Sequence, residues 1–186
     1  MFLELSFGDK LKYKRDEIVK LTDYQHIRLN NNMYMGGKDL HTQPVLIYQD
    51  GLPVVEEMTW VPALYTAWRE IVDNALDEMC GHGFGDKLEI TYDEKTLITT
   101  VRDNGRGIPI EFDSEHKMHK ATLALTETKA GRNFGERGMV AGTNGIGASA
   151  VIAVSEWSNV EVIRDGKKFT QEFVEGTPAL DQLTIK

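Results

Sequence analysis

The clearest periodic pattern in the chain lies between Val61 and Gly81. Apolar residues recur there at intervals of three and four positions, which places them on one face of a helix. They are Leu64, Ala67, Trp68, Ile71, Val72, Ala75, Leu76 and Met79. Pro62 suits the first turn of a helix and Gly81 suits its end, so the sequence predicts a helix over residues 62–79 whose apolar stripe faces the core.

Alternating apolar and polar runs elsewhere predict strands joined in hairpins. Asp50-Gly51 and Asp165-Gly166 each separate two such runs, and Asp-Gly pairs are typical of hairpin turns. The expected strands cover residues 45–48, 52–56, 87–92, 97–103, 157–164 and 167–174. Further helices are expected at residues 22–29, 114–126 and 148–154, with a polar loop at residues 30–32. Helices that lie beside strands in mostly hairpin order favour an α+β sandwich, with a mixed or antiparallel sheet covered by helices.

The length and composition fit one large domain. The chain has 186 residues, of which 41% are hydrophobic and 27% charged, enough for a packed core. Residues 1–23 are expected to form an extended N-terminal arm and residues 24–186 the domain. Cys80 is the single cysteine and cannot form an internal disulfide, and no apolar run approaches the roughly 20 residues of a membrane span. We therefore expect a cytoplasmic protein with no membrane partner.

The charge balance argues against direct binding of nucleic acid. Lys and Arg number 21 and Asp and Glu number 29, which gives a net charge of −8. Binding to the phosphates of nucleic acid requires a basic face. A short basic cluster, Lys10–Arg15, lies in the expected arm, where a solvated segment or a dimer contact explains it more simply.

The predicted helix 62–79 carries a second, polar stripe formed by Glu70, Asn74 and Asp77. One interpretation is a solvated polar face. That interpretation leaves an excess of acid unexplained, because Arg69 is the only basic residue nearby. An amide oxygen one turn from a carboxylate could hold Mg²⁺, which keeps several waters and binds substrate phosphates, while the carboxylate takes a proton from an attacking water.

A turn rich in glycine follows the strand expected at residues 97–103. Its sequence, Asp103-Asn-Gly-Arg-Gly-Ile-Pro109, puts a carboxylate at the strand end and two glycines beside it. The carboxylate could accept a hydrogen bond from the exocyclic amine of a base, and the glycines would leave room for the ring. An ordinary Asn-Gly hairpin turn is the alternative, although the second glycine and the Ile-Pro pair exceed what such a turn requires.

Six glycines fall within 17 positions of one another, with three basic residues among them. The glycines are Gly131, Gly135, Gly138, Gly142, Gly145 and Gly147, and the basic residues are Lys129, Arg132 and Arg137. Free backbone N–H groups and the positive end of the following helix suit phosphate binding. A surface loop is one alternative. The dinucleotide pattern G-x-G-x-x-A at residues 145–150, with Asp165 some 20 residues on, is another, but it requires a preceding strand where the sequence is loop-like.

Taken together, three segments resemble the nucleotide motifs of the GHKL ATPases, the superfamily of gyrases, MutL-type repair proteins, heat-shock chaperones and histidine kinases. They are residues 70–78, 103–109 and 142–147. Residues 27–36 and 129–135 further resemble the entry segment and the lid loop of type II topoisomerase ATPase subunits. The likeness runs from about residue 24 to residue 176 and is closest to the subunits of T-even-type phages.

The resemblance implies the GHKL (Bergerat) sandwich with a glycine-rich ATP lid, and it implies ATP hydrolysis with Mg²⁺. Glu70 would be the general base, Asn74 the Mg²⁺ ligand and Asp103 the residue that reads adenine. Further residues implied at the base are Asp77, Gly107, Ile108 and Pro109, and those at the phosphates and lid are Lys129, Gly142, Asn144, Gly145 and Gly147. Tyr34 would lie near the nucleotide or the dimer arm, and Arg164 would face aminocoumarin inhibitors.

The sequence departs from the gyrase pattern at several positions. Thr66 stands where a histidine orients the catalytic glutamate, and Asn133 and Asn144 stand where a lysine and a histidine contact phosphates. The resemblance implies a domain truncated before the transducer domain, with ATP and a second copy of the chain as partners and DNA bound only through the full-length enzyme. The alternatives are a MutL-like ATPase, a nucleotide-dependent dimerisation module with negligible hydrolysis, and a dinucleotide oxidoreductase.

Overall fold

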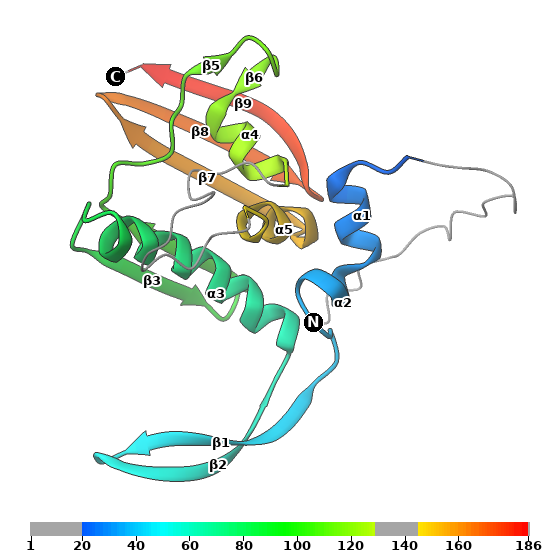
Figure 1. Ribbon diagram of the computed structural model, residues 1–186, viewed down its shortest axis with the longest axis vertical. Coiled ribbons are helices and arrows are strands. Elements are labelled where there is room, and N and C mark those ends of the chain that lie inside the picture. The colour runs from blue at the N-terminus through cyan, green and yellow to red at the C-terminus, as the bar shows by residue number, and fades with distance from the viewer. Residues whose placement is uncertain (1–19, 129–144, 186) are drawn as a thin grey trace, which may run out of the picture.

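The computed structural model of the protein describes residues 20–128 and 145–185. Its helices are α1 (Asp23–Leu29), α2 (Asn31–Tyr34), α3 (Pro62–Leu76), α4 (Lys120–Thr126) and α5 (Gly147–Val154). Its strands are β1 (His41–Gln49), β2 (Leu52–Trp60), β3 (Leu88–Asp93), β4 (Ile98–Asp103), β5 (Phe112–Asp113), β6 (Met118–His119), β7 (Trp157–Arg164), β8 (Lys167–Val174) and β9 (Thr177–Ile185). Helices and strands share one body, from which the β1–β2 hairpin projects (Figure 1).

Every strand pair in the described part of the chain is antiparallel. β1–β2, β3–β4 and β5–β6 each form a two-stranded sheet, and β7, β8 and β9 form a three-stranded sheet in that order. The predicted α+β class is therefore confirmed, and the strand pairing is antiparallel rather than mixed. β9, which extends the last hairpin, was not expected from the sequence.

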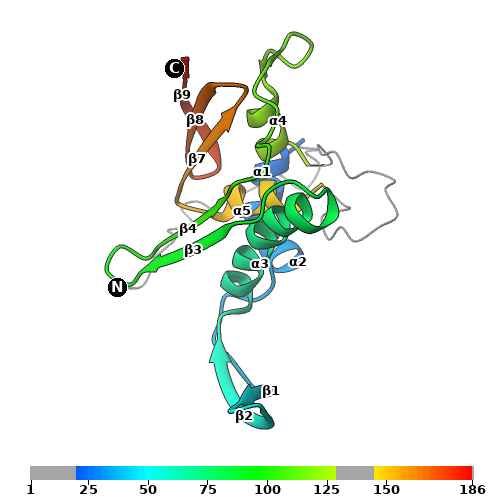
Figure 2. The same cartoon turned by 90° about the vertical axis from the view of Figure 1, so that its left-hand side faces the viewer.

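The core lies between the three-stranded sheet and the helices. Phe169 and Phe173 of β8 are fully buried, the first beside Ala121 of α4 and the second beside Ile152 of α5. On the other face of α5, Ala150 and Ala153 pack against Ile27 of α1 and Met35. α5 is thus the central helix, because it contacts α1, α3 and α4 (Figure 2).

The helix ends follow the local sequence closely. Thr22 caps α1 by accepting a hydrogen bond from the backbone of Gln25, whose side chain bonds back to Thr22, and this capping box confirms the predicted start. α3 begins at Pro62 as predicted and continues through a π-helical turn, Asp77–Gly81. The predicted loop at residues 30–32 is wrong, because Asn31 begins the short helix α2.

Two further predictions need correction. The helix expected at residues 114–126 begins only at Lys120, because the preceding residues form the small β5–β6 hairpin and its turn. The apolar stripe of α3 does not face the core along its whole length, since Leu64, Trp68 and Leu76 stay exposed. The narrow β3–β4 sheet covers only part of this face, where Trp68 meets Tyr92 of β3 with ring centroids 5.6 Å apart.

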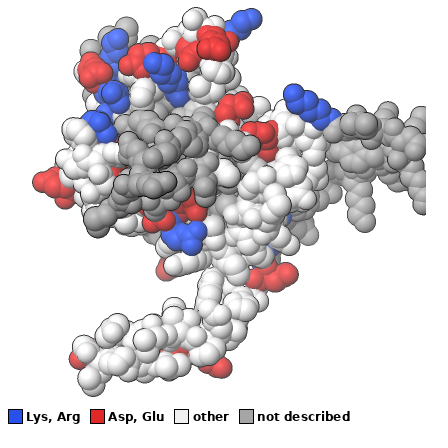
Figure 3. Space-filling view, in the orientation of Figure 1, with Lys and Arg blue, Asp and Glu red and all other residues white. Residues whose placement is uncertain are grey.

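The β1–β2 hairpin, residues 41–60, stands apart from this core. Four of its apolar side chains are between 61% and 76% exposed; they are Leu46, Tyr48, Leu52 and Val55. The hairpin contains three acidic residues and no Lys or Arg, and its visible face is mostly uncharged (Figure 3). Across the described residues, no helix is both long and apolar enough to cross a membrane.

Candidate active site

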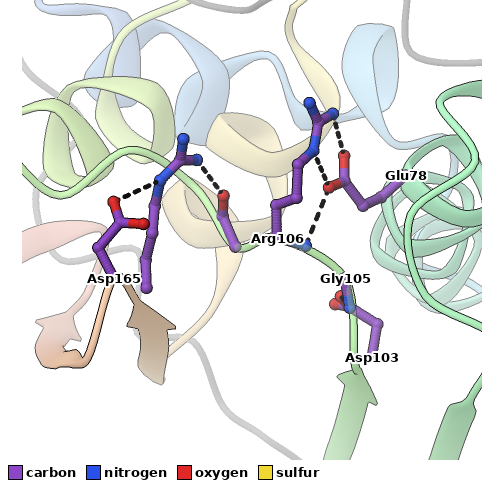
Figure 4. Close-up of polar contacts among 7 residues, drawn as sticks. Glu78, Asp103, Gly105, Arg106 and Asp165 are labelled. Atoms are coloured by element: carbon purple, nitrogen blue, oxygen red, sulfur yellow. Dashed lines mark hydrogen bonds and ion pairs between the residues drawn. The ribbon is translucent and has the colours of Figure 1, made fainter.

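The turn after β4 is held in place by a buried glutamate from the end of α3. Glu78 is 6% exposed, and its Oε1 accepts hydrogen bonds from the backbone N of Arg106 at 3.0 Å and from Nε at 2.8 Å. Its Oε2 accepts a third bond from Nη2 of Arg106, also at 3.0 Å (Figure 4). The π-helical turn Asp77–Gly81 carries Glu78 into this position, so α3 and the turn are fastened together.

Arg106 is held on its other side by an aromatic ring. Its guanidinium lies 3.6 Å from the ring centroid of Phe84, a cation–π contact. The hydrogen bond to Glu78 raises the pKa of Arg106 further above its ordinary value. Sequence reasoning identified no partner for Glu78; the only hint was its place in the acidic excess around Asp77.

Gly107, the second glycine of the turn after β4, is bound by Arg164 at the end of β7. Nη1 of Arg164 donates a hydrogen bond to the carbonyl oxygen of Gly107 at 2.7 Å, and its Nε lies 3.5 Å from Asp165. Gly107 has φ +73°, and a Cβ there would collide with Val162 of β7. The turn therefore needs glycine at this position for both its conformation and its packing.

Asp103, the predicted adenine reader, ends β4 and is exposed. Its Oδ1 accepts a hydrogen bond from the backbone N of Gly105 at 2.9 Å. The next residue, Asn104, ties the turn to the preceding loop, because its Oδ1 accepts bonds from the backbone N of Asp86 and of Lys87, both at 2.9 Å. Asp103 thus projects from a fixed backbone with a carboxylate that water can reach.

Glu70 of α3 lies against the first residue of α5. A Cβ on Gly147 would collide with the Glu70 carboxylate, so this carboxylate lies directly against the backbone at the start of α5. Arg69 donates a hydrogen bond to Oε1 of Glu70 at 3.0 Å, and that bond raises the pKa of Arg69. The structure therefore brings together the acidic stripe and the end of the glycine-rich stretch, which are far apart in the sequence.

The other members of the polar stripe differ in burial. Asn74, one turn after Glu70, is exposed, whereas Asp77 is 6% exposed. A uniformly solvated polar face therefore does not describe this stripe. Among the described residues, no three His, Cys, Asp or Glu side chains cluster closely enough to hold a metal ion by themselves.

The remaining predicted residues fall into two groups. Lys129, Gly142 and Asn144 lie outside the described residues, so their roles stay predictions. Ile108 packs against both the core cluster that contains Phe169 and the one that contains Phe173, and Pro109 beside it is half-buried. Gly145 lies just before α5 and has φ +61°. The Tyr34 hydroxyl is hydrogen-bonded to Nδ1 of His26 at 2.9 Å, beside the α1–α5 contact.

The dinucleotide alternative loses support at Asp165. That pattern requires an acid at the end of a strand, but Asp165 sits in the tight turn between β7 and β8 with φ +50°. Its side chain is 78% exposed and paired with Arg164.

Comparison with protein families identifies the chain. The family model described as histidine kinase-, DNA gyrase B-, and HSP90-like ATPase matches residues 61–177, a segment that includes α3, the turn after β4 and α5. The chain belongs to this ATPase family. The implied superfamily is therefore confirmed, together with its fold.

Curated relatives of this ATPase are subunits of bacterial topoisomerases. The chain is 33% identical over 166 residues to the B subunit of DNA topoisomerase 4 from Staphylococcus epidermidis and 33% identical over 168 residues to that from Staphylococcus aureus. Each match covers 88% of this chain but 21% of the relative. The chain thus spans about a fifth of the length of these relatives.

Solved structures of topoisomerase ATPase regions share the fold. The ATPase and transducer domains of topoisomerase II from Balamuthia mandrillaris align over 92% of this chain and 46% of theirs, with 26% identity and a TM-score of 0.82. The yeast topoisomerase II ATPase region gives a TM-score of 0.81 at 21% identity, over 92% of this chain and 48% of its own, and shows the fold alone. The ATPase domain of Thermus thermophilus gyrase B, solved with an aminocoumarin, covers 89% of this chain and 36% of its own at 26% identity and a TM-score of 0.63. The chain is therefore a homologue of the ATPase regions of type II topoisomerases.

Proposed function

We propose that this chain binds ATP between α3 and the glycine-rich segment and hydrolyses it. The observation that carries the proposal is the approach of Glu70 to Gly147. It sets a carboxylate suited to act as a base beside the first residue of a helix, whose N–H groups suit phosphate. Membership of the ATPase family supports the same chemistry.

Adenine would bind at the turn after β4. The Asp103 carboxylate would accept a hydrogen bond from the exocyclic amine of the base, and Gly107 would leave space for the ring. Because Glu78, Arg106 and Arg164 hold the turn before any base arrives, little ordering would be required on binding. Asp77 would complete the base pocket from the end of α3.

Hydrolysis would begin with proton transfer from water to Glu70. A carboxylate held within reach of the reacting water contributes typically 10²- to 10⁴-fold to the rate. Gly145 and Gly147 would bind phosphate through their backbone N–H groups, and Lys129, Gly142 and Asn144 would add contacts from the segment between α4 and α5.

The residues present fit a Mg²⁺ ion that arrives with the nucleotide. Asn74 is exposed one turn from Glu70, and its amide oxygen is the kind of ligand that Mg²⁺ accepts beside waters and phosphate oxygens. The lack of a three-acid cluster among the described residues suits an ion held chiefly by substrate and water. Bound there, Mg²⁺ would supply neutralising charge at the phosphates.

Calorimetry with a non-hydrolysable ATP analogue and Mg²⁺ tests the binding step. We expect saturable binding by wild type that weakens when Mg²⁺ is withheld, and we expect Asn74→Ala to lose the part of the affinity that depends on Mg²⁺. Single-turnover hydrolysis of ATP then separates an enzyme from a dimerisation module that binds without turnover. Absence of analogue binding would contradict the proposal.

We further propose that the parent protein is a type II topoisomerase in which ATP closes a dimer of this domain during DNA strand passage. The proposal includes a relationship of this parent protein to the topoisomerases of T-even-type phages. The chain itself, with a net charge of −8, should bind duplex DNA no tighter than about 10⁻⁴–10⁻⁶ M at physiological salt. Fluorescence anisotropy with a labelled duplex tests this, and submicromolar, salt-sensitive binding would contradict it.

Aminocoumarins are proposed as competitors of ATP at this site. The gyrase B neighbour was solved with such a compound. Arg164 donates a hydrogen bond to the carbonyl oxygen of Gly107, a residue of the proposed base pocket. We expect novobiocin to displace the ATP analogue, and Arg164→Ala to weaken the drug far more than the analogue. Lys168→Ala, on the neighbouring strand, is the control. Equal weakening of both ligands by Arg164→Ala would count against the assignment.

A further inference from the structure

We propose that Asn104 is a positioning residue for base recognition, because it fixes the turn in which the carboxylate of Asp103 is aimed at adenine. The inference rests on the proposed function, since it concerns how Asp103 distinguishes adenine from a purine that lacks the exocyclic amine. Asn104 acts through Asp103 and need not contact the nucleotide itself.

The backbone conformation of the turn does not explain an asparagine at position 104. A type I′ hairpin turn at an Asn-Gly pair requires a positive φ at both residues. Neither Asn104 nor Gly105 has a positive φ, whereas Gly107 has φ +73°. The segment is therefore not a hairpin turn of this kind, and the contacts of the Asn104 side chain explain its presence better.

The Asn104 side chain binds the loop that precedes β3, residues 82–87. Its Oδ1 accepts hydrogen bonds from the backbone N of Asp86 and of Lys87, both at 2.9 Å, and its Nδ2 donates to Oδ1 of Asp86 at 2.8 Å. Two N–H donors on one side and a carboxylate on the other identify which end of the amide is oxygen. The backbone N of Asn104 adds a bond to the carbonyl oxygen of Lys87 at 3.2 Å, so side chain and backbone are tied to one loop.

The same loop also holds the residue on the other side of Gly105. The ring centroid of Phe84 lies 3.6 Å from the guanidinium of Arg106. Gly85 has φ +87°, and a Cβ there would lie 2.8 Å from Oδ1 of Asn104 and 2.9 Å from the backbone N of Gly105. The loop therefore lies directly against the turn, and Gly105 is held between two anchored neighbours.

The position of Gly105 decides where the Asp103 carboxylate points. The backbone N of Gly105 donates to Oδ1 of Asp103 at 2.9 Å, which engages one carboxylate oxygen and leaves the other to accept from the base. Hydrogen bonds weaken steeply as their geometry departs from the preferred angle. Loss of the Asn104 contacts should therefore weaken the bond to the amine of adenine and leave contacts elsewhere on the nucleotide unchanged.

The experiment measures base preference in Asn104→Ala and wild type. Calorimetry with Mg²⁺ compares a non-hydrolysable ATP analogue with its purine-riboside counterpart, in which hydrogen replaces the exocyclic amine. We expect wild type to prefer adenine about tenfold or more, as a charged hydrogen bond allows. In Asn104→Ala this preference should fall at least about threefold, through weaker binding of the adenine analogue alone.

Asp93→Ala is the matched control for a merely structural role. Oδ1 of Asp93 accepts hydrogen bonds from the backbone N of Lys95 at 2.8 Å and of Thr96 at 3.2 Å, the same kind of contact at the opposite end of the β3–β4 sheet. Scanning calorimetry should therefore record a lower Tm for Asp93→Ala, while its preference for adenine stays that of wild type.

Exchanging the paired side chains tests the contact itself. Asn104→Asp sets a carboxylate against that of Asp86, so it should lose preference for adenine. The double variant Asp86→Asn/Asn104→Asp reverses donor and acceptor in this bond and keeps an acceptor for the two backbone N–H groups, so the preference should return toward that of wild type.

Hydrogen exchange at the Gly105 amide, measured without nucleotide, supplies a second readout. We expect faster exchange in Asn104→Ala than in wild type, and no change in Asp93→Ala. The inference is overturned if Asn104→Ala keeps the wild-type preference for adenine, if its Gly105 amide exchanges at the wild-type rate, or if Asp93→Ala reduces the preference equally. A wild-type chain that binds neither analogue would instead overturn the proposed function, and this role with it, even where Asn104→Ala speeds the exchange.

Discussion

The turn after β4 and the middle of α3 belong to the same candidate site, yet their polar groups are held very differently. In the turn, Arg106 meets Glu78 through three hydrogen bonds and Gly107 is bound by Arg164. On α3, Glu70 accepts a hydrogen bond from its neighbour Arg69, and the exposed Asn74 makes no side-chain bond to the described part of the chain.

The difference indicates that the two regions have different roles in nucleotide binding. A turn fixed in advance can recognise a base with little loss of conformational freedom on binding. Side chains on α3 that face water can instead take partners from the nucleotide and its ion. We therefore expect substitutions in the turn to change stability and affinity, and substitutions on α3 to change turnover or dependence on Mg²⁺.

The largest effect is expected from Glu70→Ala. Because the base acts on water and does not hold the ground state, ATP binding should persist while hydrolysis falls by about 10²- to 10⁴-fold. Single-turnover assays alongside calorimetry measure both. Asp73→Asn is the matched control, since Asp73 lies on the same helix and also pairs with Arg69, at 3.7 Å. Hydrolysis at the wild-type rate in Glu70→Ala would place the base elsewhere.

Asp103→Asn should act on binding rather than turnover. An amide can present its donor face to the amine of adenine, and loss of a charged hydrogen bond should weaken nucleotide affinity about tenfold or more. Glu94→Gln removes an exposed carboxylate at the end of the β3–β4 hairpin opposite to Asp103, so it serves as the control. Unchanged affinity by calorimetry would remove Asp103 from the base pocket.

Glu78→Gln tests whether the turn depends on its anchor. Loss of the charge weakens three hydrogen bonds to Arg106, so we expect Tm to fall by roughly 5 °C and affinity to fall less than in Asp103→Asn. Glu111→Gln removes the charge from an exposed pair with Lys120 and should leave Tm nearly unchanged. Equal Tm values for both variants would show that the turn is held by other contacts.

The smallest expected effect is on Asp93, which ends β3 at the end of the β3–β4 sheet opposite to Asp103. Backbone N–H groups of Lys95 and Thr96 donate to the Asp93 carboxylate and lower its pKa. Because the pKa is lower in the folded state than in the unfolded state, the ionised Asp93 carboxylate stabilises the fold above the unfolded value of about 3.9. This stabilisation is lost as the pH falls through the folded pKa. An NMR titration of the Asp93 carboxyl should have its midpoint below about 3.9, and a midpoint at or above that value would contradict the assignment.

Local patterns in the sequence were sufficient for most elements. The period of α3, the cap at Thr22 and the Asp-Gly turns each depend on residues within a few positions of one another, and the structure confirms the elements they predicted. The helix α2 was missed because Asn31, a polar residue, is buried by tertiary contacts that local patterns do not contain. The β5–β6 hairpin was missed because each of its strands has only two residues, too few to show an alternating pattern.

The candidate site was predictable in its residue types but not in its geometry. Glu70, Asp103 and Gly147 were expected to act together, yet only the fold shows that Glu70 touches the start of α5. The anchors were not predictable, because Glu78 and Arg106 lie 28 positions apart and Arg164 lies 57 from Gly107. Partners at such separations are decided by how the helices and sheets pack, and the assigned roles themselves await the experiments above.

The exposed β1–β2 hairpin has a consequence for the behaviour of the chain in concentrated solution. Both of its outer strand edges have unpaired backbone groups in the described structure, and such edges can accept strands from other molecules. Asp50, Glu56 and Glu57 are its acidic residues, and their mutual repulsion opposes contact between hairpins. Added salt screens repulsion between exposed charges. Light scattering should therefore record concentration-dependent association that becomes stronger as the salt concentration rises.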